Sequence, residues 1–279
     1  MSSKVFSKDG IHKTVIENGV IGEKPVECCV CTIVLSDIEI NGSNYDTEYI
    51  RQEKNGIEQN CIMGEFDTKL DRKFEKLLET MLENEFSDVK IQLNETIITF
   101  KIKLLKLEFN GYFFDFPADK KYALATKHKE RGVELFQQNR YIDAFYRFSK
   151  ACRLLITCIL EIDDVESTEI DGVKLIDIEN LKLILYGNLA SCQLKQNNYE
   201  EVIPLCSKIL VQDSEHVKSL YKRGLAYTAV RDFEKAENDL VKFLQYEPNN
   251  KFVHEKLNYV RHELVLSRER YAEMCKRMF

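Results

Sequence analysis

The pattern of apolar positions changes near residue 116 of this 279-residue chain. Before that point, residues 26–35 and 96–107 are rich in apolar and β-branched side chains, and the second stretch alternates apolar with polar positions. These two stretches are predicted to be strands that pair in one sheet. Between them, residues 72–83 place apolar side chains at helical spacing. This spacing predicts an amphipathic helix that packs across a curved sheet.

After residue 116 the apolar spacing is helical, and one pattern of two helices occurs three times. Each copy has a small residue in its first helix and an aromatic residue nine positions later: Gly132 and Tyr141, Ala190 and Tyr199, Gly224 and Phe233. The last two copies are 34 residues apart, which is the period of a tetratricopeptide repeat, and an insertion lengthens the first step. A further helix from Lys251 onward has an apolar side and is expected to cap the last copy.

We therefore predict an α+β protein with two domains. Residues 1–116 should form a curved antiparallel sheet with one helix. Residues 117–279 should form an all-α solenoid of three tetratricopeptide repeats and a C-terminal capping helix.

Composition and charge exclude several classes of protein. A content of 44% hydrophobic and 31% charged residues is typical of a folded chain rather than a disordered one. No apolar run approaches the roughly 20 residues that span a bilayer, and residues 1–8 lack the apolar core of a signal peptide. The formal net charge of −6 argues against nucleic acid as the main partner. Nine cysteines, an odd number, fit a reducing compartment. We expect the cytoplasm, with the nucleus as an alternative.

The sequence gives little support for a metal or a cofactor. Cys28, Cys29, Cys31 and Cys61 raise the question of a zinc site, but they lack the paired C-x2-C spacing that such sites favour. Buried cysteines within strands are the preferred interpretation. The histidines form no metalloprotease motif, and the glycines form no phosphate-binding loop. We predict no metal, no cofactor and no catalytic residue.

Several short segments of the first domain resemble the FK506-binding (FKBP) domain, in the same order. They are Gly10-Ile11-His12-Lys13, the strand from Pro25 to Leu35, Tyr45-Asp46, Met63-Gly64-Glu65, the helix ending at Met81, and Leu104 to Glu108. The join to tetratricopeptide repeats resembles the large immunophilins. Taken whole, the chain is similar to noncatalytic FKBP-like proteins, and the first domain is therefore expected to have the FKBP-like fold.

The resemblance also implies a vestigial prolyl isomerase pocket. Thr32 falls where the family has a wall tyrosine, and Phe74 replaces the tryptophan of the pocket floor. Tyr45, Asp46 and Phe100 remain at matching sites, although packing and a structural hydrogen bond explain their presence equally well. We expect no isomerase activity. The alternative is a weakly active peptidyl-prolyl cis-trans isomerase.

A binding site is expected in the repeats. By resemblance to repeat domains that bind the C-terminal EEVD peptide of the ninety-kilodalton heat-shock chaperone, four residues fall on carboxylate-clamp positions: Lys129, Asn188, Lys218 and Lys222. Lys218 and Lys222 are four apart and share a helix face, where their ammonium groups repel unless an anion lies between them. Val133 stands where the family has a polar donor, and Lys222 replaces an arginine, so affinity is expected to be reduced. The alternative is that these side chains only solvate helix faces.

The resemblance implies an adaptor or co-chaperone rather than an enzyme. Its expected partners are the tail of the ninety-kilodalton heat-shock chaperone and a client protein, for which a casein kinase 1-type circadian clock kinase is a hypothesis. Neither nucleic acid nor a membrane is expected as a partner. A further alternative is a repeat module that binds internal peptide segments or a second copy of itself.

Overall fold

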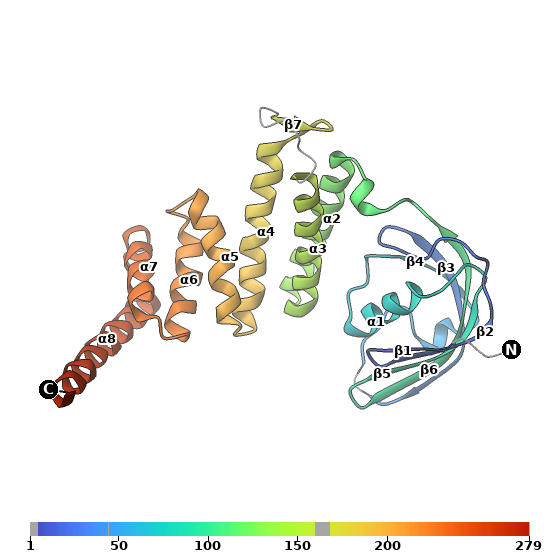
Figure 1. The fold of residues 1–279 in the computed structure, drawn as a ribbon, viewed down its shortest axis with the longest axis horizontal. Helices are drawn as coiled ribbons and strands as arrows, with labels where there is room; N and C mark the ends of the chain where they lie inside the picture. Colours follow the sequence, from blue (N-terminus) through green and yellow to red (C-terminus); the bar gives the residue numbers. More distant parts are fainter. Residues whose placement is uncertain (1–4, 44, 160–167, 279) are drawn as a thin grey trace. The chain divides into compact units, whose positions relative to one another are not determined.

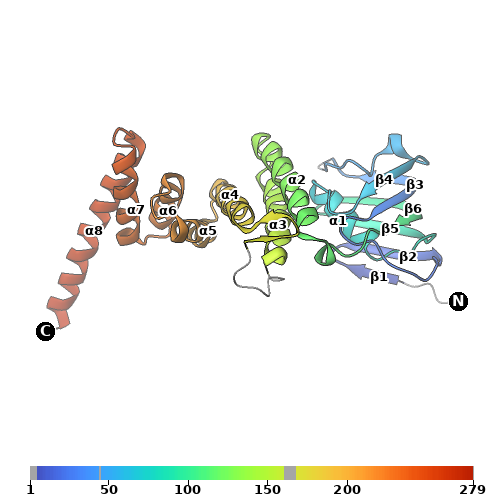
Figure 2. The same cartoon turned by 90° about the horizontal axis from the view of Figure 1, so that it is seen from above.

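The computed structural model describes residues 5–43, 45–159 and 168–278. The chain divides into two compact units, Met1–Phe116 and Pro117–Phe279 (Figure 1). The first unit is a curved sheet with one α-helix, and the second is a succession of α-helices (Figure 2). The predicted α+β fold class, a sheet domain followed by a helical repeat domain, is confirmed.

The sheet of the first unit has six antiparallel strands in the order β1-β2-β5-β6-β3-β4. The strands are β1 (Val5–Lys8), β2 (Ile11–Glu17), β3 (Val30–Asn41), β4 (Glu58–Ile62), β5 (Phe86–Leu93) and β6 (Thr96–Glu108). Two short 3₁₀ helices, η1 (Gln52–Lys54) and η2 (Phe113–Asp115), lie in the connections. The pairing of the two strands predicted from sequence is confirmed, since β3 and β6 are hydrogen-bonded neighbours.

The core of this unit lies between the sheet and α1 (Lys69–Leu78). Alternate residues of β6 from Ile98 to Leu104 are buried, and α1 contributes Phe74 and other apolar side chains to the same cluster. Complete burial of one such side chain stabilises the fold by about 1.5 to 3 kcal/mol. The alternation seen in the sequence therefore marks the face of the sheet that α1 covers.

Helix α1 begins and ends earlier than the predicted 72–83. The Thr68 side chain accepts a hydrogen bond of 3.0 Å from the backbone N–H of Asp71 and caps a helix whose first residue, Lys69, lies three residues before the predicted start. After Leu78 the backbone turns, and Met81 and Leu82 lie in the connection to β5. The apolar spacing continues past the helix because Met81 is still a buried core residue.

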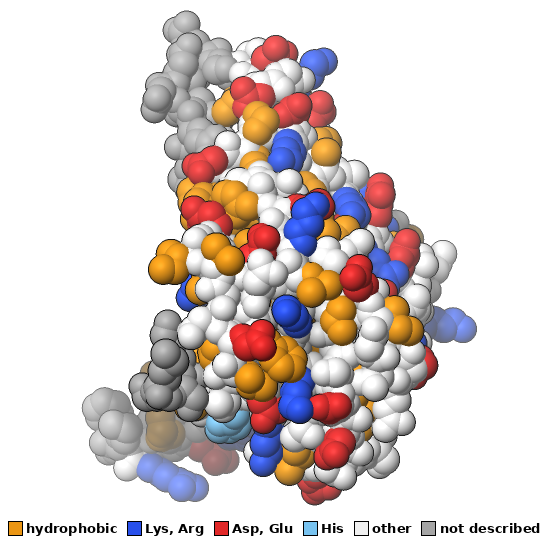
Figure 3. All heavy atoms as spheres, turned by 90° about the vertical axis from the view of Figure 1, so that its right-hand side faces the viewer, with side chains coloured by type: hydrophobic (Ala, Val, Ile, Leu, Met, Phe, Trp, Pro, Cys, Tyr) orange, Lys and Arg blue, Asp and Glu red, His pale blue; other side chains and the backbone are white. Residues whose placement is uncertain are grey.

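The outer face of the sheet carries paired charges of both signs. Lys101 lies 2.8 Å from Asp37, and Lys103 lies 4.0 Å from Glu17. The face of the molecule in Figure 3 likewise intersperses Lys and Arg with Asp and Glu among scattered apolar side chains. A mixed surface of this kind does not create the single-sign potential that attracts a nucleic acid backbone.

The second unit consists of seven helices and one small hairpin within its described residues. They are α2 (Ala118–Gln137), α3 (Tyr141–Ile159), α4 (Leu175–Lys195), α5 (Tyr199–Gln212), α6 (Val217–Ala229), α7 (Phe233–Tyr246) and α8 (Lys251–Met278), with β7 (Glu169–Ile170) and β8 (Val173–Lys174) between α3 and α4. The aromatic residues that mark the sequence repeat, Tyr141, Tyr199 and Phe233, each begin the second helix of a pair.

The small residues of the repeat allow two helices to approach closely. Gly132 on α2 faces the ring of Phe148 on α3, and Gly224 on α6 faces Leu240 on α7. A Cβ atom would lie 2.5 Å from Phe148 at Gly132 and 2.8 Å from Leu240 at Gly224, so the facing side chain would have to move in either case. Helix α8 continues the stack by packing Val253, Leu257, Val260 and Leu264 against α7. None of the helices in the described ranges has the length and apolar character that a membrane crossing needs.

Candidate peptide-binding site

The four predicted clamp residues lie on the first helices of successive pairs. Lys129 is on α2, Asn188 is on α4, and Lys218 and Lys222 are on α6. Helix α4 packs beside both α2 and α6. We call the surface that these four residues define the clamp surface.

The structure brings Lys222 next to Asn188. The Nζ atom of Lys222 donates a hydrogen bond of 2.8 Å to the backbone oxygen of Gly187, the residue that precedes Asn188 on α4. Burial is the main cause that lowers the pKa of Lys222, and the charge of Lys218 lowers it further. An anion near these two ammonium groups would offset both effects, because it stabilises the charged form.

Among the described residues, the positive charge on the clamp surface is not neutralised by an ion pair. In the ranges that the structure describes, no carboxylate forms an ion pair with Lys129, Lys218 or Lys222. Lys218 is exposed, and the other two are half-buried. Val133 follows Lys129 by one helical turn and is 38% exposed, so the surface has an apolar position there instead of a hydrogen-bond donor. The surface can therefore accept an anionic ligand without first displacing an internal ion pair.

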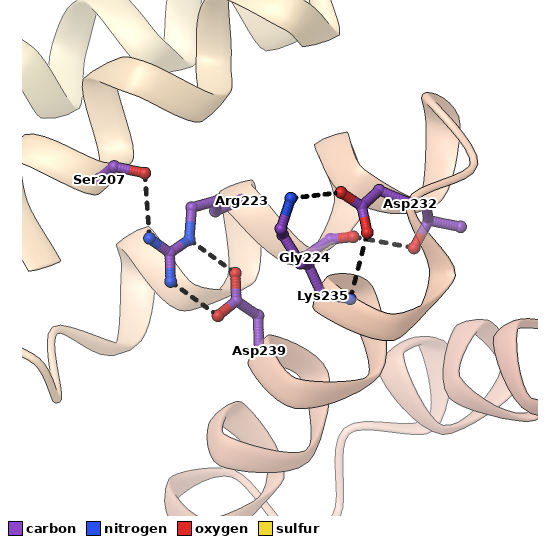
Figure 4. Close-up of polar contacts among 7 residues, drawn as sticks. Ser207, Arg223, Gly224, Asp232, Lys235 and Asp239 are labelled. Atoms are coloured by element: carbon purple, nitrogen blue, oxygen red, sulfur yellow. Dashed lines mark hydrogen bonds and ion pairs between the residues drawn. The ribbon is translucent and has the colours of Figure 1, made fainter.

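Sequence reasoning missed the residue that fixes the orientation of α6. Arg223 donates from Nε and Nη2 to the carboxylate of Asp239 on α7, at 2.7 and 2.9 Å, and from Nη1 to Ser207 on α5, at 3.0 Å (Figure 4). Asp239 is only 4% exposed. A charged residue at a repeat position that is otherwise apolar is the sequence signal that could have indicated the pair of Arg223 and Asp239.

At the foot of α7, the Asp232 side chain accepts from the backbone N–H of Lys235 and forms an ion pair of 2.7 Å with the Lys235 side chain (Figure 4). The Arg223 network links α5, α6 and α7, whereas the Asp232 contact caps the first turn of α7. Helix α6, which carries Lys218 and Lys222, is consequently held in a fixed position.

In the first unit, aromatic rings fill the interior where the vestigial pocket was predicted. Phe74 and Phe100 are 0% and 1% exposed, and their ring centroids lie 6.0 Å apart, edge to face. Tyr49 and Phe66, which sequence reasoning missed, extend the cluster, with centroids 4.9 Å apart and each 6.2 Å from Phe74.

Thr32 is not brought together with these rings. Its neighbours Cys31 and Ile33 are buried in the core, so Thr32 points to the opposite face of β3, where its hydroxyl donates to the Oδ1 atom of Asn60 at 2.9 Å. The placement of Thr32 in the pocket wall therefore needs correction, because Cys31 and Ile33 occupy the inner face at this level.

Tyr45 and Asp46 are not part of the buried aromatic cluster either. Both are exposed, Tyr45 at 37%, and they line an open pocket of about 560 Å³ together with Arg51. The residues predicted for the vestigial pocket thus lie partly in the buried core, around Phe74, and partly at an open polar surface, around Asp46.

Comparison with known proteins agrees with this architecture. Residues 6–109 match the family described as "BDBT FKBP like N-terminal", and residues 118–204 match the family described as "Bride of doubletime-like, TPR domain". The chain thus contains an FKBP-like domain followed by a tetratricopeptide-repeat domain of the Bride of doubletime-like type.

Two curated relatives and one solved structure illustrate the similarity. The rat "FK506-binding protein-like" protein is 29% identical over 186 residues, which cover 67% of this chain and 49% of the relative. Human "Peptidyl-prolyl cis-trans isomerase FKBP4" is 31% identical over 185 residues, which cover 65% and 38%. The crystal structure of residues 1–211 of CG17282 is 25% identical, covers 72% of this chain and 98% of that one, and has a TM-score of 0.62. The chain spans about half or less of the length of these curated relatives.

Proposed function

We propose that this chain is a noncatalytic adaptor whose repeats bind the carboxylate end of an acidic peptide, such as the C-terminal tail of the ninety-kilodalton heat-shock chaperone. The observation that carries the proposal is the set of three ammonium groups on the clamp surface, none of which is paired with a carboxylate in the described ranges. A terminal carboxylate accepts hydrogen bonds from several such groups at once.

The expected affinity follows from the number of contacts. A hydrogen bond to a charged group contributes roughly 1.5 to 3 kcal/mol, less where water and salt compete. Contacts from Lys129, Asn188, Lys218 and Lys222 together are enough for micromolar binding, which corresponds to about 8 kcal/mol. Because the contacts are ionic and partly exposed, binding should weaken as salt is added.

Calorimetry with the peptide EEVD tests this proposal. The full chain should bind the peptide with a free carboxylate and should lose at least about tenfold in affinity when that carboxylate is amidated. The double variant Lys218→Glu/Lys222→Glu should lose binding, whereas Lys242→Glu, which changes an exposed lysine on α7, should not. Equal affinity of the wild type and the double variant would refute the proposal. Indifference to amidation would instead favour binding of internal segments or self-association.

The absence of isomerase activity is also a proposal, and the buried rings of Phe74 and Phe100 support it. Catalysis by this fold family requires that proline be held against aromatic side chains in a water-poor pocket, and here those two rings contact one another instead. A prolyl-peptide isomerisation assay should give the uncatalysed rate. Turnover that Asp46→Ala abolishes would establish the alternative, a weak isomerase.

A casein kinase 1-type clock kinase is proposed by resemblance to the noncatalytic FKBP-like proteins, and no residue described above selects it. A pull-down with that kinase, comparing the wild type with Lys218→Glu/Lys222→Glu, would show whether the client binds and whether it binds at the clamp surface.

A further inference from the structure

A pocket of about 610 Å³ lies between the ends of α4 and α6 and the first turns of α8. None of its lining residues belongs to the clamp surface. Its lining combines three cations with three aromatic rings: Lys195, Arg231, Lys256, Tyr199, Phe252 and Tyr259. We call it the α8 pocket.

Within the described residues, the three cations of the α8 pocket form no ion pair. The lining contains no aspartate or glutamate, and across the described part of the chain no ion pair involves Lys195, Arg231 or Lys256. The Lys256 ammonium lies 5.4 Å from the ring centroid of Phe252, and that of Lys195 lies 5.9 Å from the ring centroid of Tyr141. A ring face attracts a cation without neutralising its charge. All three charges therefore remain available to an anionic ligand.

The aromatic rings of the α8 pocket are partly uncovered. Phe252 is 47% exposed and Tyr259 is 48% exposed, although Tyr259 also packs against Phe233 at a centroid distance of 6.1 Å. Rings that leave half of their area in water gain free energy when an apolar side chain covers them. The pocket thus offers an apolar floor surrounded by positive charge.

We propose that the α8 pocket binds an acidic segment of a partner protein in which an aromatic or branched apolar side chain lies between carboxylates. Charge complementarity selects the acidic residues, and the rings of Phe252 and Tyr259 receive the apolar one. This inference goes beyond the clamp surface, because no chain terminus is required and the cations are different. A segment from the interior of a partner's sequence is a suitable ligand.

Fluorescence anisotropy with the full chain tests the inference. The probe is a labelled, C-terminally amidated heptapeptide, EDEFDED, which has no free carboxylate terminus. Binding should weaken by about tenfold in Lys256→Glu, because a charge-assisted contact is lost and repulsion is gained. It should weaken by about fivefold in Phe252→Ala, and by a similar factor when the peptide's phenylalanine is replaced by alanine.

Two controls separate this site from nonspecific attraction and from the clamp surface. Lys242→Glu makes the same charge change on an exposed part of α7 and should leave affinity within about twofold. The clamp variant Lys218→Glu/Lys222→Glu should also retain the amidated peptide. Equal weakening by Lys242→Glu and Lys256→Glu, or loss of the peptide in the clamp variant, would overturn the inference. An unchanged affinity in Phe252→Ala would overturn it as well, and that exposed position carries little risk of misfolding.

Discussion

Two glycines on the first helices should respond in opposite directions to the same substitution. A Cβ atom at Gly132 would lie 2.5 Å from Cε1 and 2.8 Å from Cδ1 of Phe148, whereas a Cβ atom at Gly187 would meet nothing closer than Ile209 Cδ1 at 3.7 Å. Carbon atoms in ordinary contact are about 3.5 to 4.0 Å apart. Gly132→Ala therefore forces a buried ring to move by about 1 Å, and Gly187→Ala fits without movement.

The magnitudes follow from two opposing contributions. Replacing glycine by alanine inside a helix stabilises it by about 0.8 to 1.0 kcal/mol. Overpacking a buried site costs about 1 to 3 kcal/mol, and the Gly132 contact should fall at the upper end because Phe148 is only 1% exposed. We expect Gly132→Ala to lower the free energy of unfolding by about 2 kcal/mol and Gly187→Ala to raise it by up to about 1 kcal/mol.

Urea denaturation of the full chain, followed by far-ultraviolet circular dichroism, measures this difference. Shortening the facing ring in Gly132→Ala/Phe148→Leu should recover part of the loss relative to the sum of the single changes, because the clash is removed. If Gly132→Ala and Gly187→Ala shifted the urea midpoint by the same amount in the same direction, the close approach of α2 and α3 could not explain why residue 132 is a glycine.

Three further outcomes follow from individual contacts. Asp239→Ala should lower the free energy of unfolding by about 3 kcal/mol in urea denaturation, because it leaves the Arg223 guanidinium without its carboxylate. The double variant Arg223→Leu/Asp239→Leu should lower it by less, because no charge is left unpaired. Burial, and then the charge of Arg147, lower the pKa of His128 from 6.5 to about 3, so the unfolded chain binds a proton that the folded chain does not. Unfolding free energies measured from pH 7 downward should therefore fall by up to about 1.4 kcal/mol per pH unit below 6.5, a slope that His128→Asn should remove. Val133→Asn should tighten binding of EEVD severalfold in calorimetry by adding a donor beside Lys129, and it should not do so for the amidated peptide.

The repeat architecture was predictable because its signals are local. A small residue and an aromatic nine positions later are visible within one copy, and the 34-residue step is visible from two successive copies. Each marker aromatic is the first residue of its helix: Tyr141 of α3, Tyr199 of α5 and Phe233 of α7. The ends of α1 were less predictable, since a cap at Thr68 and a buried Met81 beyond the helix do not change the apolar spacing.

The position of Thr32 shows why the pocket was harder to predict. In a strand, a shift of one residue exchanges the two faces of the sheet. Alignment by resemblance placed Thr32 at the wall, but the register of β3 against β4 places its side chain beside Asn60, outside the core. Tyr49 and Phe66 were missed for a related reason, since they lie in irregular connections where no periodicity indicates which side chains are buried.

The neighbouring residues Lys222 and Arg223 illustrate how helix geometry separates a structural role from a proposed binding role. Successive residues on an α-helix point about 100° apart, so Arg223 meets Asp239 while Lys222 faces α4. Pairing with a buried carboxylate suits a guanidinium, whose planar donors match it at two points. An ammonium has three donors, and the bond from Lys222 to Gly187 occupies one of them. Lys222 is thus already held in place before a ligand arrives, with two donors left to meet a carboxylate. Lys222 can make fewer contacts to a carboxylate than an arginine could. This loss is offset in part because a side chain that is already held loses less conformational entropy on binding.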